Sequence, residues 1–463
     1  LDKHVPSVKY SKPRFPKWYS DELKGYIKLK EKKFNQYKSN NLNRESYKQF
    51  CGVRRIVKQL ISRDFRIFIR KTQNSLSKDP KLFWSYIKDK RGSTSIPGKL
   101  HLNDVYFEKP KDIVNAFASH FSSTFSSSSP NQVNYNTSLF SAHNNLNVNI
   151  VIDESEVFRA MKKLKDSRTS GPDQIPNFVI RDCSSVFSKP LVFLFKLILK
   201  TSCFPDMWKL SKVVPIFKKG DPGDICNYRP ISLLCNFSKI LESIISRQLF
   251  FQLKCLLTPR QHGFFTARST LTNLTCISEE IVSTFESMSQ LDVIYLDYSK
   301  AFDTVNHELL LFKLSSLGLS ESVTQFFASY LSRRTNYVMI NGHLSDHYTV
   351  TSGVPQGSTL GPLLFSIFIN DITSSIKHSK ILIFADDIKL YCKVVNNGDC
   401  RLLQDDLNEI HHWSCNNCLL LNNDKCCVVT YSNKLNVLMF EYSLNNVSLI
   451  RCSEIKDLIR CMV

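Results

Sequence analysis

The chain has 463 residues, 43% hydrophobic and 22% charged, which is enough for a large core and for more than one domain. Its formal net charge of +20 predicts a polyanionic partner such as nucleic acid or an anionic membrane surface. A membrane-spanning segment is excluded, because apolar runs such as "LVFLFKLIL" (191–199) are too short and that one is interrupted by Lys196.

The N-terminal part of the chain is strongly basic. Its first 90 residues hold 24 Lys and Arg against 8 Asp and Glu. Residues 18–72 are helix-prone, with aromatic residues spaced among the basic ones, as in "RRIVKQLISRDFRIFIRK". Such a segment could follow a phosphate backbone, although a solvated helical face has the same composition. We predict a basic helical region over residues 1–121 and a Ser/Asn-rich flexible linker over 122–152.

Three segments give clear local predictions. "DESEVFRAMKKLK" (153–165) predicts a capped amphipathic helix with Val157 and Met161 on its apolar face. Residues 96–110 predict a small β-hairpin, and residues 335–351 predict a second one around an Asn-Gly turn. Because helices and strands alternate irregularly up to the end, the chain is predicted to be an α+β protein.

Two adjacent aspartates, Asp386 and Asp387, interrupt the apolar, β-prone run "ILIFADDIKLYC". Adjacent ionised carboxylates repel each other and lose hydration on burial, so they either form an exposed turn or hold cations. Another aspartate, Asp297, follows the strand-like "VIYL". Together the three could hold two divalent ions about 3.5–4 Å apart, and hard oxygen ligands favour Mg²⁺. Nearby Asp303 and His307 have no evident chemical task, and Asp303 is predicted to start a helix.

Upstream, "VVPIFKKGDPGDICNYRPISLL" (213–234) predicts a basic hairpin. Lys218 and Lys219 precede its turn and Arg229 follows it, so the three could clamp a triphosphate. The alternative is a solvated turn, since exposed lysines commonly contact only water.

Downstream, "SGVPQGSTLGPLLFSIFIND" (352–371) places glycines and prolines ahead of an apolar helix. Gly353 and Gly357 would allow the backbone to approach a ligand, and Gln356 offers an amide to a base or sugar edge. The alternative is a set of ordinary turns, for which glycine and proline are also the common residues.

Taken in order, these stretches resemble the reverse transcriptases of non-LTR retrotransposons, the LINE and jockey-like elements. The matching stretches are "SGPDQIP" (170–176), "VVPIFKKGD…NYRPISLL", "QHGFFTARST" (261–270), "LDYSKAFDTVNH" (296–307), "SGVPQGSTLGPLLF", "FADD" and "LNNDK" (421–425). The resemblance covers about residues 155–458. It implies a right-hand polymerase with fingers over residues 153–285. The palm, with its antiparallel sheet, would cover residues 286–463, and the chain would end before the thumb.

The resemblance also implies roles for single residues. Asp297, Asp386 and Asp387 would bind two Mg²⁺ ions, for which Mn²⁺ can substitute, and Lys425 would give a proton to pyrophosphate. Phe302 falls where the family places its steric gate against the ribose 2′-OH. The other implied positions are the nucleotide contacts Lys218, Lys219, Arg229, Gln356 and Gly357 and the template or primer contacts Arg268, Gly353 and Pro355.

The implied activity is RNA-directed DNA synthesis. A nucleotide would pass from a dNTP to a DNA primer 3′ end on an RNA template, in target-primed reverse transcription in the nucleus. The alternative is a remnant that binds nucleic acid without catalysis. Phe302 argues against an RNA-copying RNA polymerase, because selection of ribonucleotides requires a polar partner for the 2′-OH.

Two stretches depart from the family pattern. In "QHGFFTARST", Phe265 and Ala267 replace the usual Arg and Gly, which predicts weaker template binding. Near the end, Leu458 and Ile459 stand where the family usually has Leu-Gly. With no endonuclease and no full thumb, the chain is expected to be a fragment of a larger polyprotein.

The 15 cysteines follow no regular spacing, and no signal peptide is evident, which favours a reduced, intracellular protein. A zinc site formed by His411, Cys415, Cys418 and Cys426 is one interpretation. The paired spacing of structural zinc sites is absent, and small core cysteines on a helix, turn and strand are the favoured alternative. His262 is interpreted as a loop residue held by hydrogen bonds.

Overall fold

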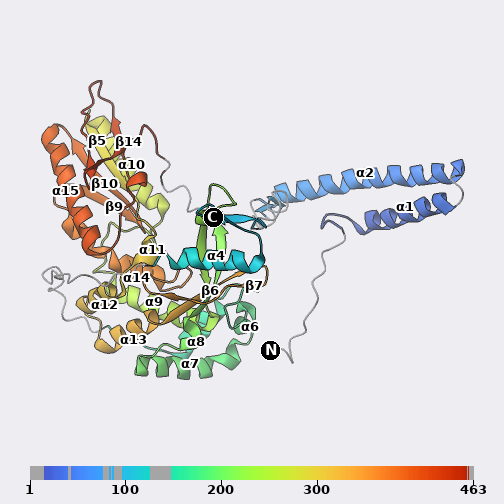
Figure 1. Ribbon diagram of the computed structural model, residues 1–463, viewed down its shortest axis with the longest axis horizontal. Coiled ribbons are helices and arrows are strands. Elements are labelled where there is room, and N and C mark those ends of the chain that lie inside the picture. The colour runs from blue at the N-terminus through green and yellow to red at the C-terminus, as the bar shows by residue number, and fades with distance from the viewer. Residues whose placement is uncertain are drawn as a thin grey trace. The chain divides into compact units, whose positions relative to one another are not determined.

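The computed structural model describes residues 15–39, 43–76, 83–84, 86–87, 96–125, 148–455 and 457. The chain divides into two compact units, Leu1–Ile96 and Pro97–Val463, and each is described by itself (Figure 1). Most of the expected linker and the departure at Leu458 and Ile459 lie outside the described residues. No helix among the described residues is long and apolar enough to cross a membrane.

The first unit is a pair of helices, α1 (Asp21–Ser39) and α2 (Arg44–Asn74), which lie side by side in Figure 1. They pack through a narrow apolar seam in which Leu23, Val57 and Leu60 are buried. The predicted helical character of this basic region is therefore confirmed. The seam is narrow because many other positions of the two helices carry charges that must stay hydrated.

The second unit begins with the predicted hairpin of β1 (Leu100–Leu102) and β2 (Val105–Phe107), followed by α4 (Pro110–Ser122). The α4 helix buries Phe117 against the ring of Tyr228, with 5.1 Å between ring centroids. This part of the chain thus packs with the second unit, and the expected boundary at residue 121 differs from the division at 96. The physical reason is the apolar face of α4, which needs a partner to cover it.

The second unit contains many helices besides its two large sheets. The predicted helix at 153–165 is confirmed as α5, with Asp153 accepting a hydrogen bond from the Ser155 N–H and with Val157 and Met161 buried. The helices are α5 (Glu154–Lys162), α6 (Asn177–Asp182), α7 (Ser184–Thr201), α8 (Asp206–Lys209), α9 (Asn236–Leu253), α10 (Thr270–Glu286), α11 (Ala301–Thr304), α12 (His307–Ser316), α13 (Glu321–Leu331), α14 (Gly361–Phe368) and α15 (Asn397–Asn416), with 3₁₀ turns at Ile225–Asn227, Asn370–Ser375 and Asn423–Lys425.

The first large sheet has the order β4-β3-β6-β7, and β8 also pairs with β6. Its strands are β3 (Leu210–Phe217), β4 (Tyr228–Leu233), β6 (Arg334–Ile340), β7 (His343–Leu344) and β8 (Tyr348–Val350). The predicted Asn-Gly turn is confirmed between β6 and β7, where Asn341 and Gly342 have φ of 50° and 86°. Because β3 pairs in parallel with β6, this sheet takes strands from both sides of the expected boundary at residue 285.

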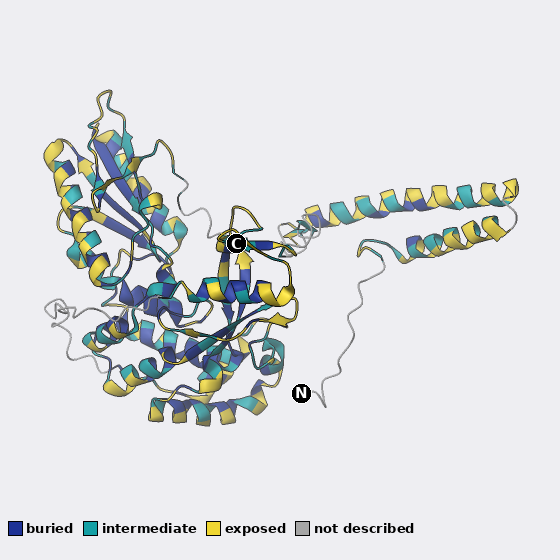
Figure 2. Ribbon diagram, viewed as in Figure 1, coloured by how far each residue is buried: buried dark blue, intermediate teal, exposed yellow. Residues whose placement is uncertain are grey.

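The second large sheet has the order β14-β11-β5-β10-β9 and is antiparallel except between β11 and β14. Its strands are β5 (Gln290–Leu296), β9 (Lys380–Phe384), β10 (Asp387–Val394), β11 (Cys427–Ser432) and β14 (Ile450–Arg451), and a small hairpin pairs β12 (Ser443–Leu444) with β13 (Val447–Ser448). Figure 2 shows its central strands mostly buried, as expected where helices cover a sheet. The predicted α+β class is confirmed.

Candidate active site

The two adjacent aspartates lie at the tip of the β9–β10 hairpin. Phe384 pairs with Asp387 across the turn, and Ala385 takes a left-handed φ of 56°. Gln261 stabilises the tip, because its Oε1 accepts a hydrogen bond from the Ala385 N–H at 2.9 Å. A Cβ on Gly263 would lie 2.4 Å from the Ala385 nitrogen, so only glycine fits there. The "QHG" stretch therefore supports the hairpin that carries the aspartates.

The register of β5 and β10 brings a further carboxylate to this tip. Ile388 lies opposite Leu296, so continuing the antiparallel register by one residue places Asp387 beside Asp297. The structure therefore brings Asp297, Asp386 and Asp387 together, although the first two lie 89 positions apart in the sequence.

The carboxylates at this tip disfavour one another's ionisation. The pKa of Asp387 is raised to about 7, first by partial loss of hydration and then by the charges of Asp386, Asp297 and Asp457. Asp387 is solvent-exposed, so screening by water weakens these effects. Burial and the charge of Asp297 likewise raise the pKa of Asp386. The tip thus concentrates negative charge that only a cation can offset.

A lysine offsets part of the negative charge at the tip. Lys425 Nζ lies 3.0 Å from Asp297 Oδ1, in a pair that is exposed on both sides. Among the described residues, no group of three or more His, Cys, Asp or Glu side chains is arranged so that it could hold a metal ion. In this arrangement the charge of Asp297 is balanced by the Lys425 ammonium.

Basic side chains of the hairpin formed by β3 and β4 act electrostatically on the aspartates. Burial, then the charges of Arg229 and Lys425, lower the pKa of Lys218, while Asp297 acts in the opposite direction. The charges of Arg229 and Lys218 also favour the ionised form of Asp386. These mutual effects place Lys218 and Arg229 near the carboxylates. Neighbouring Lys219 is exposed.

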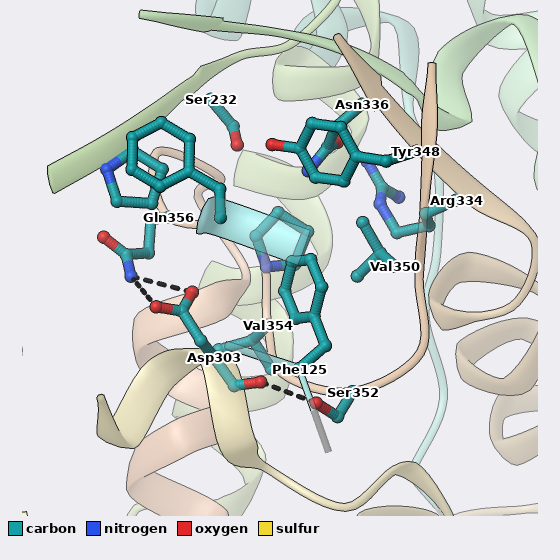
Figure 3. Close-up of a pocket in the computed structure, with 13 residues that line it drawn as sticks. Phe125, Ser232, Asp303, Arg334, Asn336, Tyr348, Val350, Ser352, Val354 and Gln356 are labelled. Carbon is teal, nitrogen blue, oxygen red and sulfur yellow. Dashed lines mark hydrogen bonds between the residues drawn. The ribbon is translucent and has the colours of Figure 1, made fainter. Parts of the chain in front are cut away.

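The α11 turn carries Phe302 and Asp303. The Phe302 ring stacks on Phe365 with 4.5 Å between centroids and contacts Phe264 edge-on at 6.1 Å. The Asp303 carboxylate accepts hydrogen bonds from Gln356 Nε2 at 2.8 Å to each oxygen (Figure 3). Asp303 does lie in the first turn of a helix, but the sequence analysis missed its contact with Gln356, because the two residues lie in separate motifs.

A small cavity lies beside this pair (Figure 3). It has a volume of about 30 Å³, room for roughly two water molecules. Asp303, Arg334 and Tyr348 line it, and burial raises the pKa of Asp303 to about 6. Arg334 Nη1 donates to Tyr330 O at 2.9 Å, whereas Arg334 Nη2 has no hydrogen-bond partner among the described residues.

The two glycines of "SGVPQG" approach protein backbone. Gly353 and Gly357 have φ of 83° and 113°, which disfavour any side chain. A Cβ would lie 2.6 Å from Phe302 O at the first and 2.5 Å from Ser232 O at the second. On this face the two glycines are required by the packing of backbone against backbone, and their close approach to a ligand stays a prediction. Pro355, between them, is half-buried.

Arg268 also has partners within the protein. Its Nη1 donates to Gln261 O at 2.6 Å and Thr258 O at 3.3 Å, and its guanidinium lies over the Phe265 ring. The predicted template contact would have to compete with these bonds. Ala267 has a left-handed φ of 63°, a conformation that favours the glycine usual at this position.

His262 and the zinc candidates have local roles. His262 Nδ1 lies 2.8 Å from Thr272 Oγ1, which confirms its interpretation as a hydrogen-bonded loop residue. His411 and Cys415 are in contact at 3.7 Å on α15, whereas Cys426 lies against the backbone of Asp297. Cys415 is exposed, so the core interpretation fails for that cysteine.

Comparison with known proteins matches residues 216–442 to a family described as reverse transcriptase (RNA-dependent DNA polymerase). The chain is 30% identical over 297 residues to the RNA-directed DNA polymerase from mobile element jockey of Drosophila melanogaster, covering 60% of the chain and 32% of that protein. It is 29% identical over 269 residues to the probable RNA-directed DNA polymerase from transposon BS of the same species, covering 56% and 30%. The chain thus spans about a third of the length of these relatives.

Proposed function

We propose that the chain, whose residues 216–442 match the reverse transcriptase family and which is similar to polymerases of non-LTR retrotransposons, is an RNA-directed DNA polymerase. It would add nucleotides from dNTPs to a DNA 3′ end on an RNA template, in the service of retrotransposition. One observation carries the proposal: Asp386 and Asp387 at the β9–β10 tip lie beside Asp297, opposite basic side chains.

In this proposal residues 286–463 form the palm, which includes the second large sheet, and residues 153–285 form the fingers, which include β3 and β4 of the first. The aspartates lie on the former, and Lys218 and Arg229 lie on the hairpin of the latter. An incoming triphosphate would lie between them, where its charge meets guanidinium and ammonium groups. Lys219 is exposed at the same turn and would add to the attraction.

The carboxylates at the tip are the kind of donor that divalent cations require, but in the described arrangement they are not grouped to hold an ion, so metal binding would have to displace Lys425 from Asp297. Carboxylate oxygens are the ligands that Mg²⁺ prefers, and the raised pKa of Asp387 reflects charge that a cation would offset. Asp297, Asp386 and Asp387 would hold the ions, with Mn²⁺ as a substitute. Bound Mg²⁺ would neutralise the triphosphate and polarise the primer 3′ oxygen.

The protein groups around the tip would orient the reactants. Lys425, which forms an ion pair with Asp297, would give a proton to the departing pyrophosphate. The Phe302 ring, braced by Phe365, would leave no polar partner for a ribose 2′-OH. Gln356 and Gly357 would line the nucleotide pocket. A template and primer would bind mainly through phosphates and 2′-hydroxyls, near Arg268, Gly353 and Pro355.

Primer extension tests the catalytic assignment. With oligo-dT on poly-rA, dTTP and Mg²⁺, Asp386→Asn is expected to lower incorporation at least about a hundredfold, because it removes a charge that the metals need. Asp405→Asn, an exposed carboxylate on α15, serves as the matched control. Equal incorporation by the unmodified chain and Asp386→Asn would reject the assignment.

RNA binding separates the enzyme from the noncatalytic remnant. Both hypotheses predict salt-sensitive binding to poly-rA, since the chain carries a net charge of +20. Only the enzyme predicts that Asp386→Asn binds RNA normally while losing incorporation. Binding by the unmodified chain without incorporation in Mg²⁺ or Mn²⁺ would favour the remnant.

Sugar selection tests the role of Phe302. Phe302→Ala is expected to raise the relative use of UTP against dTTP by roughly tenfold to a hundredfold, because the ring would no longer block the 2′-OH. Leu360→Ala, a buried residue outside the aromatic stack, controls for loosened packing. An unchanged preference in Phe302→Ala would count against the gate.

A further inference from the structure

The buried carboxylate of Asp303 controls the orientation of the Gln356 amide. Both carboxylate oxygens lie 2.8 Å from Gln356 Nε2. An ionised carboxylate can only accept hydrogen bonds, whereas an amide has a donating nitrogen at one end and an accepting oxygen at the other. Asp303 therefore selects the amide orientation in which the nitrogen turns inward.

The rest of the surroundings leaves Gln356 little freedom. The main-chain carbonyl oxygen of Gln356 accepts a hydrogen bond from the Ser232 N–H at 2.8 Å. This bond ties Gln356 to β4, the strand that carries Arg229. The preceding loop is tied to α11, because Val354 N donates to Phe302 O at 2.8 Å. Gln356 is thus held between the turn that carries Phe302 and the strand that carries Arg229.

The consequence lies at the other end of the amide. In Figure 3 the Oε1 end of Gln356 points away from Asp303 and from the lined cavity. Across the part of the chain that the structure describes, no group donates a hydrogen bond to this oxygen. The half-buried side chain therefore offers a hydrogen-bond acceptor and keeps its donor occupied.

We propose that Asp303 is a positioning residue that makes Gln356 present a hydrogen-bond acceptor to the bound nucleotide. This inference rests on the proposed function, which puts the nucleotide between Phe302 and Arg229. The complementary group on the nucleotide is a donor, either a sugar hydroxyl or a base N–H. Asp303 itself acts only through Gln356.

Asp303→Asn tests the proposal with little change in side-chain volume. An asparagine both donates and accepts, so either end of the Gln356 amide can face it and the orientation is no longer selected. The readout is the Kd of dTTP and of ddTTP for the chain on poly-rA with a dideoxy-terminated oligo-dT primer and Mg²⁺. Both nucleotides carry the same charge, so their ratio is insensitive to the charge that the substitution removes.

The two sources of the donor give different results. If the donor is the 3′-hydroxyl, Asp303→Asn weakens dTTP binding by about tenfold and leaves ddTTP binding nearly unchanged. If it is a base N–H, dTTP and ddTTP binding stay nearly unchanged, because the one N–H of thymine pairs with the template, whereas dATP and ddATP on poly-rU weaken alike. Unchanged Kd values for all four nucleotides in Asp303→Asn would overturn the proposal.

Two further variants separate positioning from general loosening. Ser352→Ala removes the hydroxyl that donates to Asp303 O at 2.7 Å but keeps the carboxylate–amide contact, so it should leave the Kd ratio unchanged. In a Gln356→Met background, Asp303→Asn should cause no further loss of binding, and an additional loss there would overturn the proposal. Nucleotide binding on the blocked primer involves no chemical step. If this binding pattern is found but an unblocked primer is not extended, the polymerase function is rejected and the positioning role of Asp303 is not.

Discussion

Asp292 and Asp387 lie on neighbouring strands of the same sheet, yet their surroundings differ sharply. Asp292, inside β5, is 0% exposed, and its carboxylate accepts hydrogen bonds from Tyr442 OH at 2.8 Å and Thr430 Oγ1 at 2.7 Å. Asp387, at the start of β10, receives no hydrogen bond from a described side chain and has Asp386 beside it. One carboxylate is satisfied by donors, and the other is surrounded by like charge.

This difference distinguishes a structural carboxylate from one arranged for a cation. A buried carboxylate with a full set of donors holds the surrounding elements in place, here the C-terminal segment against β5. Carboxylates that repel one another destabilise the protein unless an ion joins them, which is the arrangement expected at a functional site. The two positions should therefore respond to substitution with opposite signs.

The largest effect is expected at the structural carboxylate. Asp292→Ala would leave the Tyr442 hydroxyl without its acceptor and the Arg451 guanidinium without its ion-pair partner, and should lower the free energy of unfolding by about 3–5 kcal/mol. Urea denaturation measures this, with the exposed Asp405→Ala as control. A loss below 1 kcal/mol would contradict the structural role assigned to Asp292.

The opposite sign is expected at the acidic tip. Asp387→Asn removes repulsion with Asp386 and Asp297, and without Mg²⁺ should raise the free energy of unfolding by about 1 kcal/mol at pH 8, after allowance for screening by solvent. The same denaturation experiment measures it. Destabilisation by this substitution would show that Asp387 serves packing.

The pH profile should show the same repulsion. The pKa of Asp387 is about 7 in the folded chain and about 4 in an unfolded one, so the folded state binds more protons between these values. Without Mg²⁺, stability should therefore rise as the pH falls from 8 towards 5, and this rise should be smaller in Asp387→Asn. Thermal unfolding across that range tests it, and identical profiles for the two proteins would contradict it.

The smallest effect is expected at Lys425. Its ion pair with Asp297 is exposed on both sides, so Lys425→Met should destabilise the metal-free chain by only about 0.5 kcal/mol. The loss should disappear at saturating Mg²⁺, where the metal takes over the charge balance. A loss that persists in Mg²⁺ would indicate a packing role for the lysine stem.

Local features of the fold were accessible from the sequence. The Asn-Gly turn at 341 and 342, the hairpin at 96–110 and the helix capped by Asp153 were all confirmed. Each depends on a few consecutive residues whose backbone preferences and short-range hydrogen bonds act within a turn or two.

Other assignments stay predictions, because they depend on contacts between residues that are distant in sequence. The glycines of "SGVPQG" were expected to approach a ligand, but Gly353 faces the backbone of α11 and Gly357 that of β4. Arg268 was expected at the template, but it binds carbonyl groups of its own loop. A glycine in a motif indicates that another group approaches the backbone closely, and an arginine indicates that hydrogen bonds are donated. Neither residue identifies the partner.

By itself the sequence determined the residue types at the candidate site and their order, including the three aspartates, the basic hairpin and Phe302. Only the tertiary structure decided that β5 and β10 pair in the register that sets Asp387 beside Asp297, and that Asp303 turns the amide of Gln356. The reason is that side-chain chemistry is local, whereas strand register and buried hydrogen bonds depend on how segments far apart in the chain pack together.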